Sequence, residues 1–440
     1  MFSRFVAPLS VPERRAAGKA LRDRVHRVDQ GRFDAPGARP ELQTHLKAAV
    51  AGRQAEILPL RWGRMCESAF KFYRGTAALM AGDLRPMPTA GLQAACCGDT
   101  HLMNLGAYAD PDGGLLFDLN DFDECCEGPF EWDLKRLCAS FVLGGRESGH
   151  GEAACKDAVQ GLVRSWREGL HRFAELPARE LARFEIRSTD GHLHLEPIFE
   201  QAARDTPQKL LAKATAPDAT GFARFIEKRP GLRPLEDDEV RPILAAWPSY
   251  LDSLPPGPRQ TLGRYRPYDF AHRAAGCGSL GVRDLLVLCV GISAEDALFL
   301  EFKAQPGSCW KASAPGTHRG REVAEGVQRM QTWSDHYLGW ATVDGAPFLV
   351  RQWSDHKASI EVELLAGETL RHYAELCGLV LAKAQARSGD AAMLSGYAGH
   401  ADKLDGALAE FAMAYADQAT RDWEAFKTLV REGRFEVMQP

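Results

Sequence analysis

The segment GDTHLMN (98–104) contains side chains that could carry out phosphoryl transfer. Asp99 could accept the proton of an attacking hydroxyl group, and Asn104, five residues later, could bind a metal ion that bridges nucleotide phosphates. A second metal ligand has to return to the same place, and Asp121 in NDFDE (120–124) is positioned to do so. A turn in which Asp99 caps a helix explains the first segment equally well when it is taken alone.

The segment GCGSLGV (276–282) is typical of a loop that covers nucleotide phosphates. The residues that we expect to contact the phosphates are Gly276, Gly278, Ser279 and Gly281. A dinucleotide-binding fold requires a strand before such glycines and a helix after them. Here a loop precedes them and a strand follows, which is the order in kinases. A glycine-rich turn that binds nothing is the alternative.

Lys303 ends the apolar run ALFLEFKA (297–304), which predicts a strand. Because side chains alternate along a strand, Lys303 lies on the less apolar face, where it could pair with nucleotide phosphates. It then needs a carboxylate to orient it. The predicted helix 319–333 offers Glu325, to which we assign this role, with Glu322 as the alternative. Taken alone, Lys303 is also explained as a solvated lysine on an edge strand.

Together these groups supply a proton acceptor, metal ligands, a phosphate-covering loop and a lysine–glutamate pair, which are the parts that phosphoryl transfer requires. Their order is unusual, since in ordinary kinases the glycine loop and the lysine precede the catalytic loop. A circular permutation would explain this order. We therefore expect an α+β, protein-kinase-like fold of two lobes with an apparent circular permutation and extra helices.

The elements that must position these groups follow from periodicity and turn residues. A PDGG turn (111–114) and a VDG turn (343–345) predict hairpins, and the residues 67–84 and 131–175 read as helices. The expected organisation is an N-terminal helical extension (1–57), the catalytic-loop part of a helical lobe (58–175), a helical insertion or linker (176–264), a β-rich nucleotide-binding lobe with a hinge (265–360) and the rest of the helical lobe (361–440).

The composition excludes several classes of protein. The chain has 440 residues, a net charge of −5 and 45% hydrophobic residues, which argues against disorder and against a protein that coats nucleic acid. No apolar stretch is long enough to span a membrane, and the N-terminus becomes charged too early for a secretory signal. Eleven cysteines in a long chain suggest reduced thiols. We expect a cytoplasmic protein without a membrane or nucleic-acid partner.

Several segments make the chain similar to a known family: CGDTHLMNLG (97–106), FDLNDFDE (117–124), GPFEWDLKRLCAS (128–140), GVRDLLVLCVG (281–291) and YAELCGLVLAKAQARSGD (373–390). They resemble the DUF2252 family of uncharacterised bacterial proteins, over about residues 58–399. That family is grouped by similarity with the protein-kinase-like superfamily, near the aminoglycoside phosphotransferases. The resemblance implies a fold and a reaction class but no substrate.

The resemblance also implies roles for single residues. Asp99 would be the base, and Asn104 and Asp121 the Mg²⁺ ligands. A structural aspartate follows the metal-binding aspartate by twelve residues in the phosphotransferases, and Asp133 stands at that distance from Asp121. This spacing favours Asp121 over Asp118 or Asp123 as the ligand.

Other positions are expected to support the site. His101 occupies the second histidine position of the motif, Asp123 lies beside the metal ligand, and Arg74 could pair with Asp83. Two departures are Cys97, where many phosphotransferases have histidine, and Ala304-Gln305 after the lysine, where an acidic residue is expected. By the same resemblance, the helices within 141–260 and 390–440 would build the acceptor pocket.

The sequence therefore predicts an ATP- and Mg²⁺-dependent phosphotransferase that acts on a hydroxyl of an unknown small molecule or protein. A nucleotidyl transferase and a pseudokinase-like nucleotide-binding module are alternatives on the same fold. A metal site built from thiols is a third possibility, with ligands among Cys96, Cys97, His101, Cys125 and Cys126. Adjacent cysteines suit a zinc tetrahedron poorly, because neighbours in a strand point to opposite faces.

Overall fold

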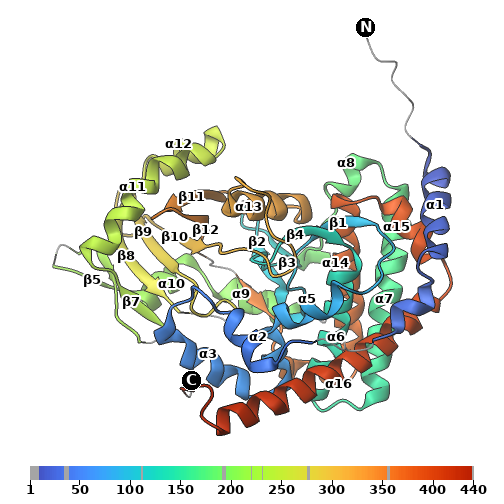
Figure 1. Cartoon of the computed structure of the whole chain (residues 1–440). Coiled ribbons are helices and arrows are strands. Elements are labelled where there is room, and N and C mark those ends of the chain that lie inside the picture. The colour runs from blue at the N-terminus through green and yellow to red at the C-terminus, as the bar shows by residue number, and fades with distance from the viewer. Residues whose placement is uncertain are drawn as a thin grey trace.

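The computed structural model describes residues 9–33, 39–110, 112–190, 195–219, 221–229, 231–274, 278–353 and 357–438. Helices make up 52% and strands 16% of it, and the strands form separate antiparallel sheets, so the expected α+β class is confirmed. The largest sheet lies on one side of the molecule and the long helices on the other (Figure 1). None of the described helices is long and apolar enough to cross a membrane.

The largest sheet has six antiparallel strands in the order β11-β12-β10-β9-β8-β7. The strands are β7 (Leu232–Pro234), β8 (Arg266–Arg273), β9 (Asp284–Val290), β10 (Ala297–Ala304), β11 (Gly339–Val343) and β12 (Ala346–Gln352). Helix α13 (Arg319–Met330) connects β10 to β11. The predicted VDG hairpin is confirmed, because Asp344 and Gly345 join β11 to β12 and both have positive φ.

The two faces of this sheet have different partners. Leu300 and Phe302 of β10 belong to a buried cluster that includes helix α11 (Asp237–Ser253). Glu301 and Lys303 point to the opposite face, and both are buried. A sheet covered by α11 on one side therefore presents two buried charges on its other side.

The helical part of the molecule contains α6 (Glu131–Glu147), α7 (Glu152–Glu175), α14 (Thr369–Ser388), α15 (Ala391–Ala398) and α16 (Lys403–Arg431). Helices α7 and α14 pack closely, since a Cβ on Gly378 of α14 would lie 2.2 Å from the carbonyl oxygen of Leu162 in α7. The predicted helix 131–175 is divided into α6 and α7, because the chain turns at Gly149, whose φ is +85°. One large apolar core joins these helices.

Two small sheets lie beside these helices. They consist of β1 (Gln93–Cys96) with β4 (Cys126–Pro129), and of β13 (Ala358–Ser359), β2 (Leu105–Ala109) and β3 (Leu115–Leu119). The short helix η4 (Leu102–Asn104) precedes β2. The predicted hairpin 105–119 is confirmed by the pairing of β2 with β3, and the Asp110 carboxylate accepts the N–H of Gly114 at 2.8 Å to close its turn. The hairpin therefore returns the chain to Asp121, close to Asn104 at the end of η4, whose carbonyl accepts the N–H of Asn120 at 2.8 Å.

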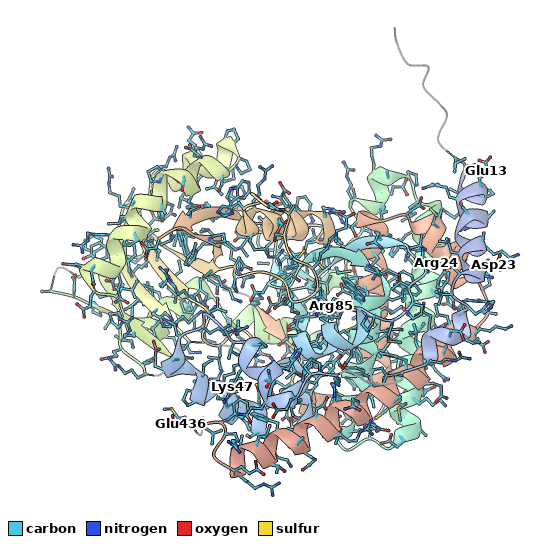
Figure 2. All side chains as sticks on the ribbon, viewed as in Figure 1. Glu13, Asp23, Arg24, Lys47, Arg85 and Glu436 are labelled. Atoms are coloured by element: carbon cyan, nitrogen blue, oxygen red, sulfur yellow. The ribbon has the colours of Figure 1, made fainter. Side chains whose placement is uncertain are left out.

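The N-terminal region contains α1 (Val11–Ala20), η1 (Leu21–Asp23), η2 (Arg27–Gly31), α2 (Leu42–Ala48), η3 (Ala55–Ile57), α3 (Leu58–Cys66), α4 (Ala69–Arg74) and α5 (Ala77–Leu84). The predicted helix 67–84 is two helices, since Thr76 leaves helical geometry and its hydroxyl donates to the Phe72 carbonyl at 2.9 Å. Exposed side chains such as Glu13 and Asp23 project outward from this region (Figure 2).

The segment 176–264 is mostly helical, as predicted, but it also contributes strands. Its elements are α8 (Ala178–Leu181), η5 (Ser188–Asp190), α9 (Glu196–Arg204), α10 (Pro207–Ala214), β5 (Thr215–Pro217), β6 (Ala223–Phe225), β7, α11 and α12 (Pro256–Leu262). Strand β7 pairs with β8 at the edge of the large sheet. The segment 176–264 therefore contributes an edge strand to the large sheet and the helix α11 that packs on it.

The short helix η7 (Val362–Leu364) follows β13.

Candidate active site

A polar cavity of about 710 Å³ brings together most of the residues that the sequence singled out. Its lining includes Arg74, Asp99, His101, Asn104, Asp121, Asp123, Gly278 and Ser279. These residues come from α4, from the loop around η4, from the end of the β2–β3 hairpin and from the loop between β8 and β9. Segments that are far apart in the chain therefore form one site.

The loop that carries Asp99 is held by backbone hydrogen bonds. The buried Asp133 carboxylate accepts the N–H of Cys97 at 2.7 Å and the N–H of Gly98 at 2.9 Å. Gly98 has a φ of +83°, and a Cβ there would lie 2.3 Å from the carbonyl oxygen of Glu124. The indole N–H of Trp310 donates to the Gly98 carbonyl. Only glycine fits at this position, and Asp133 makes the supporting contacts that its spacing suggested.

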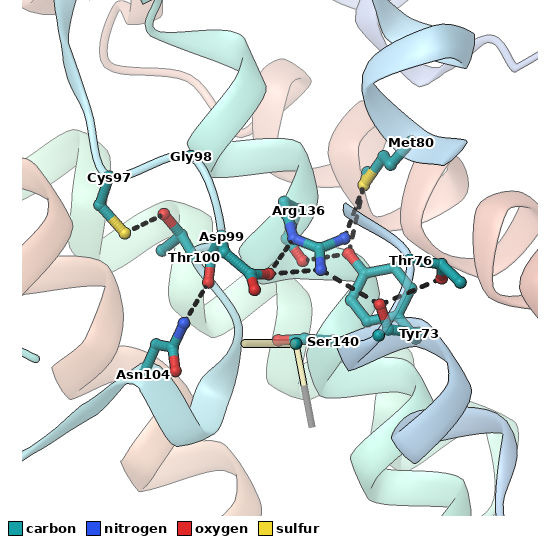
Figure 3. Close-up of polar contacts among 12 residues, drawn as sticks. Tyr73, Thr76, Met80, Cys97, Gly98, Asp99, Thr100, Asn104, Arg136 and Ser140 are labelled. Atoms are coloured by element: carbon teal, nitrogen blue, oxygen red, sulfur yellow. Dashed lines mark hydrogen bonds and ion pairs between the residues drawn. The ribbon is translucent and has the colours of Figure 1, made fainter. Parts of the chain in front are cut away.

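Asp99 has one oxygen engaged in an ion pair and the other near the glycine loop. The Arg136 guanidinium, which is completely buried, donates to Asp99 Oδ1 from Nε at 2.7 Å and also from Nη2 (Figure 3). Burial raises the pKa of Asp99, and Arg136 opposes this effect without cancelling it. Asn104 donates from Nδ2 to the Asp99 carbonyl at 2.6 Å. The carboxylate is thus fixed in orientation while its proton affinity stays raised.

Lys303 is buried and does not itself line the polar cavity, but it is paired with Asp123, which does. Burial alone would lower the pKa of Lys303, but Asp123 and Asp121 raise it above its usual value. Burial alone would raise the pKa of Asp121, but the neighbouring cations Lys303, Arg351 and Lys357 lower it below its usual value. Lys303 and Asp121 therefore both remain ionised. Gln305 adds a hydrogen bond to Asp123 Oδ1 at 3.3 Å.

The expected pairing of Lys303 with Glu325 is wrong in this structure. Glu325 is exposed and pairs with Arg321 at 2.7 Å, while Glu322 contacts Ser313 and Arg319. Helix α13 buries the stripe that includes Val323, Val327 and Met330, so Glu325 points away from the sheet. Asp123 supplies the carboxylate partner instead.

The glycine loop is described only from Gly278 onward, so Gly276 lies outside the described residues. Gly278 adjoins Asp99, since a Cβ on Gly278 would be 3.5 Å from Asp99 Oδ2. Its carbonyl accepts from Arg53 at 2.6 Å and from Arg61 at 2.5 Å. Gly281 has a φ of +85°. Two arginines that the sequence analysis did not single out thus fix the loop against the proposed base.

The predicted ion pair between Arg74 and Asp83 is not formed. Asp83 pairs with Arg39 at 2.9 Å and accepts the Tyr415 hydroxyl at 3.0 Å. The Arg74 guanidinium instead lies over the Phe70 ring at 6.0 Å and lines the polar cavity. The break between α4 and α5 explains the difference, because Arg74 and Asp83 no longer share one helix.

A second cavity of about 560 Å³ lies on the other side of Asp123 and is lined by Tyr108, Phe122, Arg351 and Lys357, among others. Arg351 donates to Glu301 Oε2 at 2.5 Å. It belongs to β12. Burial and Arg351 lower the pKa of Lys357 to about 7. The face of the sheet beside Lys303 is thus a network of buried charges.

The thiols do not form a metal site in the part of the chain that is described. No group of three or more His, Cys, Asp or Glu side chains there is placed to hold a metal ion. Burial raises the pKa of Cys125 and of Cys126 to about 12, and it raises that of Cys97 as well. These sulfurs are protonated thiols, whereas zinc binds thiolates.

The most informative residue that sequence reasoning missed is Arg136. It lies three positions after Asp133 on α6, so both side chains reach the Asp99 loop from one face of the helix. The sequence does offer one signal: the charged residues Asp133, Lys135 and Arg136 lie within a largely apolar helix, so a buried helix would bury these charges too. Buried charges require partners, but the sequence does not indicate that the partner of Arg136 is Asp99.

His101 makes a testable contribution to the pH dependence of stability. It is buried against Phe70, and burial holds its pKa well below the usual value. Below about pH 6.5 the unfolded chain binds a proton there that the folded chain does not, so the free energy of unfolding falls by up to ~1.4 kcal/mol per pH unit. The free energy of unfolding is measured by urea titration at pH 7 and at pH 5. Between these two pH values it should fall by ~1–2 kcal/mol less in His101→Phe than in wild type. Replacing the exposed His26 with alanine should not change the loss; an unchanged loss in His101→Phe would contradict the prediction.

Comparison with known proteins gives one result. Residues 53–429 match the model of a family that is described as "Uncharacterized protein conserved in bacteria (DUF2252)". No curated protein and no solved structure matches the chain.

Proposed function

Because the chain belongs to the DUF2252 family, whose description names no activity, we propose its function from the site: it is an ATP- and Mg²⁺-dependent phosphotransferase that acts on a hydroxyl group. One observation carries this proposal. The polar cavity joins Asp99, Asn104 and Asp121 to the glycine loop, and Lys303 is paired to Asp123 on its wall. These are the groups that phosphoryl transfer needs at one place.

The residues fit a magnesium ion. Mg²⁺ prefers oxygen ligands and is usually bound by one or two carboxylates together with substrate phosphates. Asp121 offers an ionised carboxylate and Asn104 an amide oxygen, and both line the polar cavity. The ion would neutralise charge on the phosphate oxygens during transfer. With two protein ligands, its remaining positions would be filled by phosphates and water.

The residues also fit a nucleoside triphosphate. The polar cavity has a volume in the range of small-molecule sites. Lys303 supplies a fixed positive charge for phosphate oxygens, and Asp123 holds its side chain in place. Gly278 lets the backbone approach the phosphates closely, and Arg53 and Arg61 hold its carbonyl.

The chain's own groups account for the proton transfer. An acceptor hydroxyl near Asp99 Oδ2 would lose its proton to that oxygen, whose raised pKa suits a base at neutral pH. Arg136 orients the carboxylate through Oδ1, and Asp133 holds the loop. Arg136 and Asp133 are therefore positioning residues, and Asp99 is the group that meets the acceptor.

A permuted kinase-like fold is part of this proposal, and the topology supports it. The glycine loop joins the first two long strands of the sheet, β8 and β9. The lysine lies on the third, β10, followed by α13 and the β11–β12 hairpin. Protein kinases likewise carry the lysine on their third strand, after a glycine-rich loop. The catalytic-loop segment precedes all of these elements, as a circular permutation requires.

A nucleotide-binding module without turnover is the second candidate. One observation favours it, namely that Arg136 engages the proposed base through two donors. An ion pair of this kind stabilises the ionised carboxylate and so opposes proton transfer to it. Tight ATP binding without any product would support this candidate.

A thermal-shift titration with ATP, with and without Mg²⁺, tests the proposed function. A ligand at ~100 times its dissociation constant adds about 2.7 kcal/mol to the free energy of unfolding. We expect such a shift in wild type and in Glu325→Gln, whose carboxylate is exposed, but not in Lys303→Ala or Asp121→Ala. Absence of a shift in wild type would overturn the proposal. Analysis of the product, ADP or pyrophosphate, then separates phosphoryl from nucleotidyl transfer.

A further inference from the structure

One end of the polar cavity is built by the N-terminal region. Arg61, Arg74, Ala77 and Ala78 line it together with the end of α2 and the turn that follows, namely Ala48, Ala49, Ala51, Gly52 and Arg53. None of the described residues that line the cavity comes from 141–260 or 390–440, where the acceptor pocket was expected. The space next to Asp99 is therefore shaped by α2 to α5, so the region expected to be an extension takes part in the site.

Among the described residues at this end of the cavity, Arg74 is the cation without a hydrogen-bond or ion-pair partner. In the described part of the chain its guanidinium makes no hydrogen bond or ion pair, and its Nε is buried without an acceptor. The other arginines of the cavity are engaged: Arg53 and Arg61 hold backbone carbonyls, and Arg283 pairs with Asp344 at 3.3 Å. A buried N–H without an acceptor costs free energy that a ligand oxygen could recover.

Arg74 lies on the side of the base and not on the side of the lysine. A Cβ on Gly278 would lie 3.2 Å from the backbone carbonyl of Arg74 and 3.5 Å from Asp99 Oδ2, so the backbone at Arg74 and the Asp99 carboxylate both adjoin Gly278. The charge of Arg74 affects the pKa of Asp99 and of His101, whereas the main influences on Lys303 come from other groups. Arg74 is thus suited to a group on the acceptor, next to the hydroxyl that Asp99 would deprotonate.

We propose that the acceptor is a small alcohol that already carries an anionic group, a phosphate or a carboxylate, and that Arg74 binds this group inside the polar cavity. The inference rests on the proposed function and names the substrate class of the same site. A guanidinium binds either anion through two parallel N–H donors. Ala77 and Ala78, the first residues of α5, line the same end, where the helix dipole also favours an anion.

The transfer step balances with ATP as the phosphoryl donor. The acceptor hydroxyl gives its proton to Asp99, and its oxygen forms a bond to the terminal phosphorus of ATP. The bond from that phosphorus to the bridging oxygen breaks, and ADP leaves with the electron pair. The product is a phosphate ester that carries the original anion as well.

The experiment compares wild type with variants of Arg74 and Lys303 by thermal shift. The ligands are ATP·Mg²⁺ and three probes, namely glycerol, glycerol 3-phosphate and glycerate. We expect the two anionic probes, but not glycerol, to stabilise wild type, and Arg74→Gln to weaken their binding at least ~10-fold. Arg74→Gln should keep the ATP·Mg²⁺ shift, and Lys303→Ala should lose that shift while keeping the response to the anionic probes. Arg321→Gln, an exposed arginine on α13, serves as the control.

The outcomes separate the inference from the proposed function. Loss of the ATP·Mg²⁺ shift in Arg74→Gln, or equal shifts with glycerol and glycerol 3-phosphate, would overturn the inference. An ATP·Mg²⁺ shift that is absent from wild type, with the anion shift still dependent on Arg74, would overturn the phosphotransferase and keep the anion site. Arg74→Lys keeps the positive charge but lacks the two parallel N–H donors of the guanidinium, so it should bind the anions with intermediate affinity. This variant shows whether the loss in Arg74→Gln could instead come from a folding defect.

Discussion

Replacing Asp99 with asparagine is expected to lower ATP turnover by about 10²–10⁴-fold and to leave the ATP·Mg²⁺ thermal shift in place. Asparagine cannot accept the acceptor proton, but its amide oxygen can still accept from Arg136. The loop that carries Asn104 should therefore stay in position. The measurement is the rate of ADP release, with water as the acceptor or with glycerol 3-phosphate if it binds.

The choice of substitution decides how this experiment is interpreted. Asp99→Ala would leave the completely buried Arg136 without its counter-ion, which costs several kcal/mol, so lost activity could reflect unfolding. Asp417→Asn is a matched control, because Asp417 is an exposed carboxylate that pairs with Arg146 at 2.8 Å. Undiminished turnover in Asp99→Asn would exclude Asp99 as the base. Bound ATP without turnover in wild type would favour the binding module.

Replacing Lys383 with methionine is expected to lower the free energy of unfolding by about 3–5 kcal/mol. Lys383 of α14 pairs with Asp118 of β3, and both side chains are at most 5% exposed. Removal of the lysine leaves a buried carboxylate whose remaining hydrogen bond within the described residues is from the N–H of Leu119 at 2.9 Å. Urea unfolding measures the change. The same pair explains why Asp118, one of three aspartates considered as the metal ligand, is not available for that role.

A double variant distinguishes a broken pair from lost packing. Asp118→Leu combined with Lys383→Met should lie within ~1 kcal/mol of wild type or be more stable, because two apolar groups replace two buried charges. Arg204→Met serves as a surface control, since Arg204 and Glu200 form an exposed pair, and it should change stability by less than ~0.5 kcal/mol. Additive losses in the double variant would contradict the explanation.

Much of the fold could be predicted from local patterns. Strand β10 was recognisable from its alternation, and the two hairpins from turn residues that adopt positive φ or cap the turn. The breaks at Thr76 and Gly149 were not recognised, because the apolar periodicity continues across both of them. The order of strands in the sheet depends on pairings between distant segments, about which local patterns carry no information.

The site could be predicted in part, and its errors have physical reasons. Spacing brought Asp99, Asn104 and Asp121 together as candidates, and the structure places all three on one cavity. The partner of Lys303 depends on the rotation of α13 about its axis, which the stripe of Val323 and Val327 sets. That stripe was visible in the sequence and already turned Glu325 outward. The pairing of Asp99 with Arg136 could not be predicted from spacing alone, because it requires α6 to lie under the loop.

The close packing of α7 against α14 has a consequence for synthesis on the ribosome. The Leu162–Gly378 contact joins residues that are 216 positions apart in the chain. At ~5–20 residues per second, α7 is complete for about 10–40 s before α14 is available to cover it. During that time its apolar stripe, which includes Leu162 and Trp166, lacks the helix α14 that covers it in the folded protein. The apolar core is thus incomplete until α14 has been synthesised, and it can finish folding only as the C-terminal helices leave the ribosome.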